Sequence, residues 1–278
     1  MPTILICTDF SDSSRNAVSY MCRMAEFNQG PVPIQFILYH LFEIPASYSG
    51  EGISLTTINR EIDLVEEKLA EQCNSIRKQY PGLEFVARLS TGTDLKTGLE
   101  NDVAEIDPYL VIIGTGGHYS ELLSWDKEII SIIRELSVPV LVIPKHVTFS
   151  PVKKIAFSCN LKNANQFMPF HLIIRLVNFT GGQLYVLFVK SEGNEAEFSI
   201  AEEFVREKLA AINPVYHSVK EKNIVDAVSR YVKENAIDVL MVTPRMHGIW
   251  ESLVYKDHAK ELVRLNSIPV LALRQYNK

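Results

Sequence analysis

The chain has 278 residues, which is long for one small domain and suits two domains of roughly 100–200 residues each. It carries 28 Lys and Arg against 33 Asp and Glu, so its net charge is −5 and its isoelectric point lies near 5.8. This mild acidity argues against general binding to nucleic acids or anionic membranes, because both need a basic surface. No apolar run approaches the ~20 residues that a membrane-spanning helix needs.

The N-terminus and the cysteines predict a cytoplasmic protein. The chain enters strand-like sequence at residues 3–7, without a charged leader or a cleavage-site pattern, so we expect no signal peptide. The four cysteines show neither Cys-x-x-Cys spacing nor a paired framework. We therefore expect four reduced, mostly buried thiols.

The chain repeats itself once. Each half opens with a short apolar run, Ile4–Asp9 or Ile155–Asn160, and closes with a Ser-aliphatic-Pro-Val-Leu run that starts at Ser137 or Ser267. The openings lie 151 residues apart and the closings 130 apart, so the second copy is shorter by about 21 residues. Glu43–Thr57, a Ser- and Gly-bearing stretch, has no counterpart in the second half.

Strand-like and helical patterns alternate along the first half. The expected strands are Ile4–Thr8, Ile34–Phe42, Phe85–Ser90, Leu110–Gly114 and Val138–Ile143. Between the second and third, apolar residues recur every three or four positions from Ile58 to Ile76, as on one face of a helix. A second helix is expected over 95–106, with Asp94 as its N-cap, and a third over 129–136.

The second half follows the same pattern. Its expected strands are Lys154–Cys159, Gln183–Val189, Val215–Val219, Val239–Val242 and Ile268–Leu273. Near-continuous apolar strands separated by helices indicate a parallel sheet covered on both faces. The sequence therefore predicts an α/β protein of two tandem, doubly wound, five-stranded domains, 1–146 and 151–278, joined at His146–Val152.

A ligand in such a sheet is expected beyond the carboxyl ends of the strands, where the strand order reverses. Two of these ends carry polar or glycine-rich sequence, namely Cys7–Ser11 and Gly114–His118. Glycines after a strand let a phosphate approach backbone amides, although a plain structural turn accounts for them equally well.

In this order and spacing the motifs resemble a tandem universal stress protein. The resemblance covers nearly the whole chain. In the first half it rests on Thr8-Asp-Phe-Ser11, Asp107-Pro-Tyr-Leu-Val-Ile-Ile-Gly114 and Val138-Pro-Val-Leu-Val-Ile-Pro144. In the second half it rests on Asp238–Val242, His247-Gly248 and Ile268–Ala272. The resemblance implies two Rossmann-like domains that form a pseudo-dimer, in which the closing strands of the two halves pair across a pseudo-two-fold. A homodimer of such chains stays an open alternative.

The resemblance also implies an adenine-nucleotide site in the first half. Nucleotide-binding members hold ATP or AMP, with or without Mg²⁺, between the ends of the first and fourth strands, using Gly-x-x-Gly, nine residues, and then Gly-Ser or Gly-Thr. The residues expected at this site are Thr8, Asp9, Leu41, Ile113, Gly114 and Gly117, together with Lys127, which occupies the distal slot and could offset the charge of the adjacent Asp126.

The distal Gly-Ser pair is replaced by Asp126-Lys127. An Asp that caps the following helix would satisfy the amides that hold phosphates and would repel a triphosphate. AMP, adenosine or a cyclic nucleotide would therefore lose less affinity than ATP. In the second half Asn160 replaces the aspartate, Thr243–Met246 replaces Gly-x-x-Gly, and Lys256-Asp257 fills the distal slot, so this motif is degenerate.

Two hypotheses of function follow. In the first, the chain is a cytoplasmic universal stress protein whose N-terminal domain senses an adenine nucleotide. In the second, both pockets are degenerate and the chain is a nucleotide-independent interaction module with an unknown protein partner. An enzyme is not expected, because no P-loop, metal-ligand spacing or catalytic motif is present. His40 is expected to be a hydrogen-bonded core residue and Cys7 an inert buried thiol.

Overall fold

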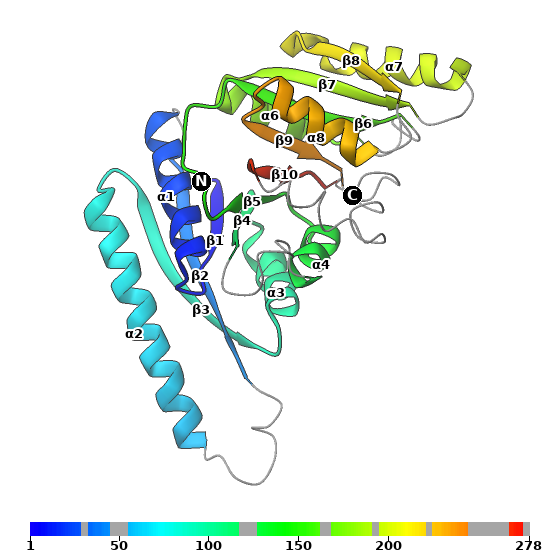
Figure 1. Ribbon diagram of the computed structural model, residues 1–278. Coiled ribbons are helices and arrows are strands. Elements are labelled where there is room, and N and C mark those ends of the chain that lie inside the picture. Colours follow the sequence, from blue (N-terminus) through cyan, green and yellow to red (C-terminus); the bar gives the residue numbers. More distant parts are fainter. Residues whose placement is uncertain are drawn as a thin grey trace.

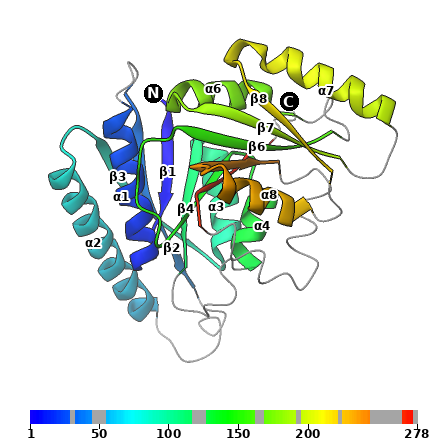
Figure 2. The same cartoon turned by 45° about the horizontal axis from the view of Figure 1, so that its top comes forward.

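In the part of the chain that the structure describes, the strands join into one ten-stranded sheet with helices on both faces (Figures 1 and 2). The computed structural model describes residues 1–28, 33–44, 55–116, 127–161, 168–190, 195–220, 224–243 and 267–274. Its strands are β1 (Thr3–Cys7), β2 (Gln35–Glu43), β3 (Glu84–Gly92), β4 (Leu110–Thr115), β5 (Val140–Pro144), β6 (Lys154–Asn160), β7 (Gln183–Lys190), β8 (Val215–Lys220), β9 (Val239–Val242) and β10 (Val270–Ala272). Its helices are α1 (Asp12–Phe27), α2 (Leu55–Gln79), α3 (Leu95–Ile106), α4 (Lys127–Glu135), α6 (Phe170–Thr180), α7 (Glu195–Leu209), the 3-10 turn η2 (Ala210–Ile212) and α8 (Ile224–Glu234).

The strand order repeats the same arrangement in each half. It runs β3-β2-β1-β4-β5 and then β10-β9-β6-β7-β8, so each half contributes five strands. Within each half all pairings are parallel, and the order reverses beside the first strand of the half. The predicted α/β class and the doubly wound, five-stranded halves are confirmed.

The two halves meet through their closing strands, as expected. β10 pairs with β5 in antiparallel register, with Leu271 opposite Leu141, and both side chains are buried. Both closing strands begin at the residue after a proline, two residues later than the sequence pattern suggests. Proline has no backbone N–H to donate to a ladder, which explains the shorter strands.

Alternate residues of each strand face opposite helical layers. Ile4 and Ile6 of β1 lie in a core with α1 and α2, whereas Leu5 and Cys7 lie in a core with α3 and α4. In the second half, α6 and α7 share the first core and α8 shares the second. The predicted stripe of α2 packs on its own sheet, where Leu69 is buried, and α2 contacts β2 and β3.

The segment between β5 and β6 is held against α1. Asn16 of α1 donates from its side-chain amide to the carbonyl oxygens of Pro144 and Val147, at 3.1 and 2.9 Å. Phe149 lies edge-on to Tyr20, with ring centroids 5.4 Å apart. Farther along, the guanidinium of Arg175 on α6 lies 4.1 Å from the ring centroid of Tyr109, so the halves also meet through side chains.

Helix boundaries follow the sequence closely. Asp94 caps α3, accepting from the backbone N–H of Thr97 at 2.8 Å, as predicted. The four cysteines are free and buried, also as predicted. Most of Glu43–Thr57 lies outside the described residues. Within the part of the chain that the structure describes, no helix is long and apolar enough to span a membrane.

The seam between the halves gives a first prediction. Leu141→Ala removes a buried side chain from the β5–β10 pairing and should lower the free energy of unfolding by about 2–5 kcal/mol. Leu64→Ala is the same substitution at a side chain that is 58% exposed, and it should alter the free energy of unfolding by less than about 0.5 kcal/mol. Denaturant unfolding measures both, and similar losses in the two variants would contradict the seam as a packed interface.

Candidate functional site

The turn after β1 carries the first two predicted site residues. Thr8 is buried, and its hydroxyl donates to the side-chain oxygen of Gln72 on α2 at 3.2 Å. The Thr8 hydroxyl oxygen accepts from the backbone N–H of Phe10 at 3.1 Å and lies 3.3 Å from the Ser14 hydroxyl. The Thr8 side chain therefore ties the turn to α1 and α2, a structural role that the sequence did not reveal.

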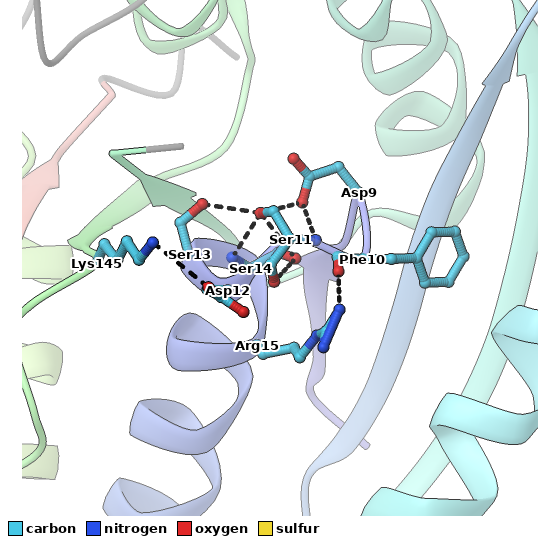
Figure 3. Close-up of polar contacts among 8 residues, drawn as sticks. All are labelled: Asp9, Phe10, Ser11, Asp12, Ser13, Ser14, Arg15 and Lys145. Atoms are coloured by element: carbon cyan, nitrogen blue, oxygen red, sulfur yellow. Dashed lines mark hydrogen bonds and ion pairs between the residues drawn. The ribbon is translucent and has the colours of Figure 1, made fainter. Parts of the chain in front are cut away.

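Asp9 follows and is exposed. Its Oδ1 atom accepts from the hydroxyl of Ser11 at 2.5 Å and from the backbone N–H of Ser11 at 3.0 Å (Figure 3). Partial desolvation of the carboxyl by its neighbours acts to raise the pKa of Asp9, but the hydrogen bonds from Ser11 and Ser14 outweigh it, so the pKa lies below its ordinary value. The turn therefore presents an oriented, ionised carboxylate.

Serine hydroxyls gather at the start of α1. Ser11 is the N-cap, and its hydroxyl accepts from the backbone N–H of Ser14 at 3.3 Å. The Ser13 hydroxyl lies 2.8 Å from that of Ser11, and the Ser14 hydroxyl donates to the Ser11 carbonyl at 3.0 Å. At the edge of this cluster, the Lys145 ammonium lies 3.4 Å from the Asp12 carboxylate (Figure 3).

Phe10 adopts a left-handed backbone conformation, with φ of 63°. A non-glycine residue in this region is held there by its surroundings. Arg15 donates to the Phe10 carbonyl, the His40 ring lies 4.6 Å from the Phe10 ring, and the Lys68 ammonium lies 4.1 Å from the Phe10 ring centroid. Contacts from β2 and α2 thus fix the turn that carries Asp9.

The other predicted residues of the first half lie on neighbouring strands. Leu41 is near the end of β2, and Ile113 and Gly114 are near the end of β4. The parallel register pairs Cys7 of β1 with Tyr39 of β2, and Ile6 of β1 with Ile112 of β4. Because parallel strands end at the same edge, Thr8, Asp9, Leu41, Ile113 and Gly114 all lie at the carboxyl edge, where the strand order reverses between β1 and β4.

Gly114 has a packing role that sequence reasoning missed. A Cβ atom added at this position would lie 2.4 Å from the carbonyl oxygen of Ser13 and 2.9 Å from the backbone nitrogen of Ser14. The first turn of α1 therefore rests directly on β4, and only glycine leaves room for it. This contact accounts for Gly114 without any ligand.

Several predicted residues are not described. Gly117 and Asp126 lie outside the described residues, as do Lys256 and Asp257. Lys127 begins α4, but its side chain is not described, and neither is that of Asn160. The structure therefore brings together five of the predicted residues and leaves the distal motif untested.

Cys7 and His40 were expected to have structural environments, as a buried thiol and as a hydrogen-bonded core residue. Cys7 is buried, and burial raises the pKa of its thiol well above its usual range. His40 is hydrogen-bonded, with Nδ1 2.6 Å from the Thr8 carbonyl oxygen; because a carbonyl accepts, Nδ1 is the donor. His40 is half-buried rather than fully in the core, and its ring lies 4.6 Å from that of Phe10.

The contributions of α2 to the site were not predicted from the sequence. Lys68 and Gln72 reach the turn from a helix that lies about 60 residues farther along the chain, and no local pattern relates them to Asp9. The serines after Asp9 did carry a signal, since a Ser-rich run before a helical stripe is typical of an N-cap. Among the described residues, no group of three or more His, Cys, Asp or Glu is placed to hold a metal ion.

Together, the parallel order, the paired closing strands and the carboxyl-edge site define a tandem protein of two Rossmann-like α/β halves. Over its full length the chain is similar to universal stress proteins, which confirms the resemblance seen in the sequence. Universal stress protein Slr1230 of Synechocystis sp. is 24% identical over 310 aligned residues, covering 99% of this chain and 100% of that protein. No model of a protein family matches the chain.

Solved structures show the same fold. A universal stress protein from Archaeoglobus fulgidus has a TM-score of 0.70 and 17% identity, covering 99% of this chain and 97% of that one. A putative universal stress protein from Pseudomonas aeruginosa has a TM-score of 0.57 and 11% identity, and the match covers 99% of this chain and 94% of that one. The cytoplasmic domain of a prokaryotic cation chloride cotransporter has a TM-score of 0.57 and 12% identity, covering 99% and 95%. At these identities the likeness shows the fold alone, and that fold occurs in more than one biological setting.

The contact at Gly114 gives a second prediction. Gly114→Ala pushes a methyl group into the backbone of α1 and should lower the free energy of unfolding by about 1–3 kcal/mol. Gly82→Ala is a matched control, because a Cβ at Gly82 has nothing within 4 Å. Thermal or denaturant unfolding compares the two variants. Equal stability would mean that α1 does not rest on β4 as described.

The Ser11–Asp9 hydrogen bond gives a third prediction. Because the pKa of Asp9 is lowered on folding, its ionised form stabilises the fold above about pH 4, and this contribution is lost as the pH falls through the folded-state pKa. Ser11→Ala should therefore cost more stability at about pH 6 than at about pH 3. The loss of the N-cap, about 1 kcal/mol, remains at both values.

Unfolding at several pH values, with an NMR titration of the Asp9 carboxyl, measures this effect. Ser13→Ala is the matched control: its hydroxyl contacts Ser11 but has no hydrogen bond to Asp9, so its cost should not change with pH. A pH-independent cost for Ser11→Ala would rule out the proposed stabilisation of the Asp9 carboxylate.

Proposed function

We propose that the chain is a cytoplasmic stress-response protein whose N-terminal half senses an adenine nucleotide. The observation that carries this proposal is the Asp9 carboxylate, which is exposed, ionised and oriented by Ser11 at the point where the strand order reverses. In open parallel sheets this point is where ligands bind. The full-length likeness to universal stress proteins supports the same site.

Five of the candidate residues have a direct role in this proposal. Asp9 accepts hydrogen bonds from the ribose hydroxyls or the adenine amino group, because an ionised carboxylate is an acceptor only. Leu41 and Ile113 supply apolar contacts for the base from the ends of the adjacent strands. Gly117 and Lys127 approach the phosphate.

AMP is the favoured nucleotide within this proposal. The distal Gly-Ser pair, which would supply free amides to further phosphates, is Asp126-Lys127 in this sequence. A helix N-terminus binds anions through free N–H groups and the helix dipole, and an added carboxylate opposes both. Each additional phosphate therefore adds less binding free energy here than it would in a nucleotide-binding member of the family.

A second candidate function is supported by Gly114. Because α1 fills the space beside this glycine, its retention does not itself indicate a phosphate site. In this alternative the chain is a nucleotide-independent interaction module, and the Ser11–Asp9 arrangement serves only to begin α1. The two candidates differ in whether the protein binds AMP at all.

Thermal unfolding with millimolar AMP, ATP or cyclic AMP, with and without Mg²⁺, separates the candidates. A ligand at 100 times its Kd adds about 2.7 kcal/mol to the free energy of unfolding, which is several degrees for domains of this size. We expect a shift with AMP that Asp9→Ala abolishes and that Asp12→Ala, a change in the same turn, retains.

The protein is first shown by mass spectrometry to carry no bound nucleotide. The absence of any shift would then reject the sensor and leave the interaction module. A shift that is equal in the wild type and in Asp9→Ala would place the nucleotide elsewhere.

A further inference from the structure

A cavity of about 440 Å³ lies beside β3, at the opposite side of β2 from the proposed nucleotide site. β3 ends the strand order, with α2 and α3 on either side of it (Figure 1). The cavity is lined by Ile62 and Glu66 of α2, by Leu89–Thr91 of β3, and by Gly98, Asn101 and Asp102 of α3. Its volume lies in the range of about 300–1,000 Å³ that is typical of small-molecule sites.

One wall of this cavity is a buried carboxylate that neighbouring side chains hold in place. Asp102 is buried, and its Oδ2 atom accepts from the hydroxyl of Tyr39 at 2.9 Å. Its Oδ1 atom accepts from Nε of Arg88 at 2.9 Å, and Arg88 also donates to Glu105 at 2.7 Å. A carboxylate has about four acceptor sites, so Oδ2 retains acceptor capacity after these bonds.

The surroundings of the cavity are acidic. Two carboxylates line it, those of Glu66 and Asp102. Arg88 pairs with Asp102 and with Glu105 outside the lining, so these four groups together carry an excess of two negative charges. None of the described lining residues is cationic, and Ser90, Thr91 and Asn101 add neutral polar groups. Such a site repels phosphates and attracts cations.

The lining also distinguishes among cations. Among the described residues, no three His, Cys, Asp or Glu side chains are grouped so that they could hold a metal ion. The cavity instead combines carboxylate, amide and hydroxyl groups with the aliphatic side chains of Ile62 and Leu89. Protonated amines donate to carboxylates, and the methylene groups between them contact aliphatic side chains.

We propose that this cavity is a binding site for a small aliphatic amine, in which Asp102 and Glu66 receive the ammonium groups. Tyr39 and Arg88 act as positioning residues, because they orient the Asp102 carboxylate. The proposal does not depend on nucleotide binding, since neither Asp102 nor Glu66 belongs to the proposed nucleotide site.

Equilibrium dialysis of the full chain with labelled diaminobutane at low ionic strength tests this site. We expect saturable binding that weakens as salt is added, because salt screens charge interactions. Butanediol, which has the same length and no charge, should not compete. Glu66→Gln should weaken binding by about fivefold, the effect of removing one unit charge about 4 Å away at a hydrated site.

Glu67→Gln is the matched control, because Glu67 is exposed on the same helix and does not line the cavity. It should leave the affinity within about twofold, as expected for a distant surface charge. Both changes are at exposed positions, so neither is expected to impair folding. Absence of diaminobutane binding, equal affinities in the two variants, or competition by butanediol would each overturn the proposal.

The AMP experiment on the same samples keeps the two proposals separate. Binding of diaminobutane without any response to AMP rejects only the nucleotide sensor. A response to AMP without binding of diaminobutane rejects only the amine site.

Discussion

The direct contact between the first turn of α1 and β4 determines the geometry of the candidate site. Because Gly114 has no side chain, the Ser13 carbonyl lies against the strand, and α1 begins close to the carboxyl edge of the sheet. From that position Ser11 caps the helix and holds Asp9 at the same time. The left-handed Phe10 joins the strand to the helix within this short distance, and Arg15, His40 and Lys68 stabilise it.

The overall architecture could be predicted from the sequence because it depends on local periodicity. Apolar runs such as Leu110–Ile113 mark strands that are covered on both faces, and the spacing from Ile58 to Ile76 marks a helix with one buried face. The repeat then relates the two halves, and the matching Pro139 and Pro269 relate their closing strands. The predicted closing strands began two residues too early, because proline has no N–H to donate to the hydrogen-bond ladder.

The site was predicted less completely, because its contacts link residues that are distant in sequence. The positions of Thr8, Asp9 and Leu41 followed from the ends of strands. The bond from Thr8 to Gln72 and the approach of Lys68 depend on how α2 packs, which no short motif encodes. Gly114 illustrates the same limit: sequence identifies a glycine after a strand, whereas only the packed helix shows which group occupies the space beside it.

The pairing of β5 with β10 has a consequence for how this protein can evolve. In a homodimer the equivalent strands would be identical, so every substitution would occur twice across the two-fold axis. Here one chain contributes both strands, and the two differ in length and sequence. Covalent connection also keeps the two halves at high effective concentration, so a short strand pairing is sufficient to hold them together. Each half is therefore free to diverge on its own, as Asp9 in the first half and Asn160 in the second already show.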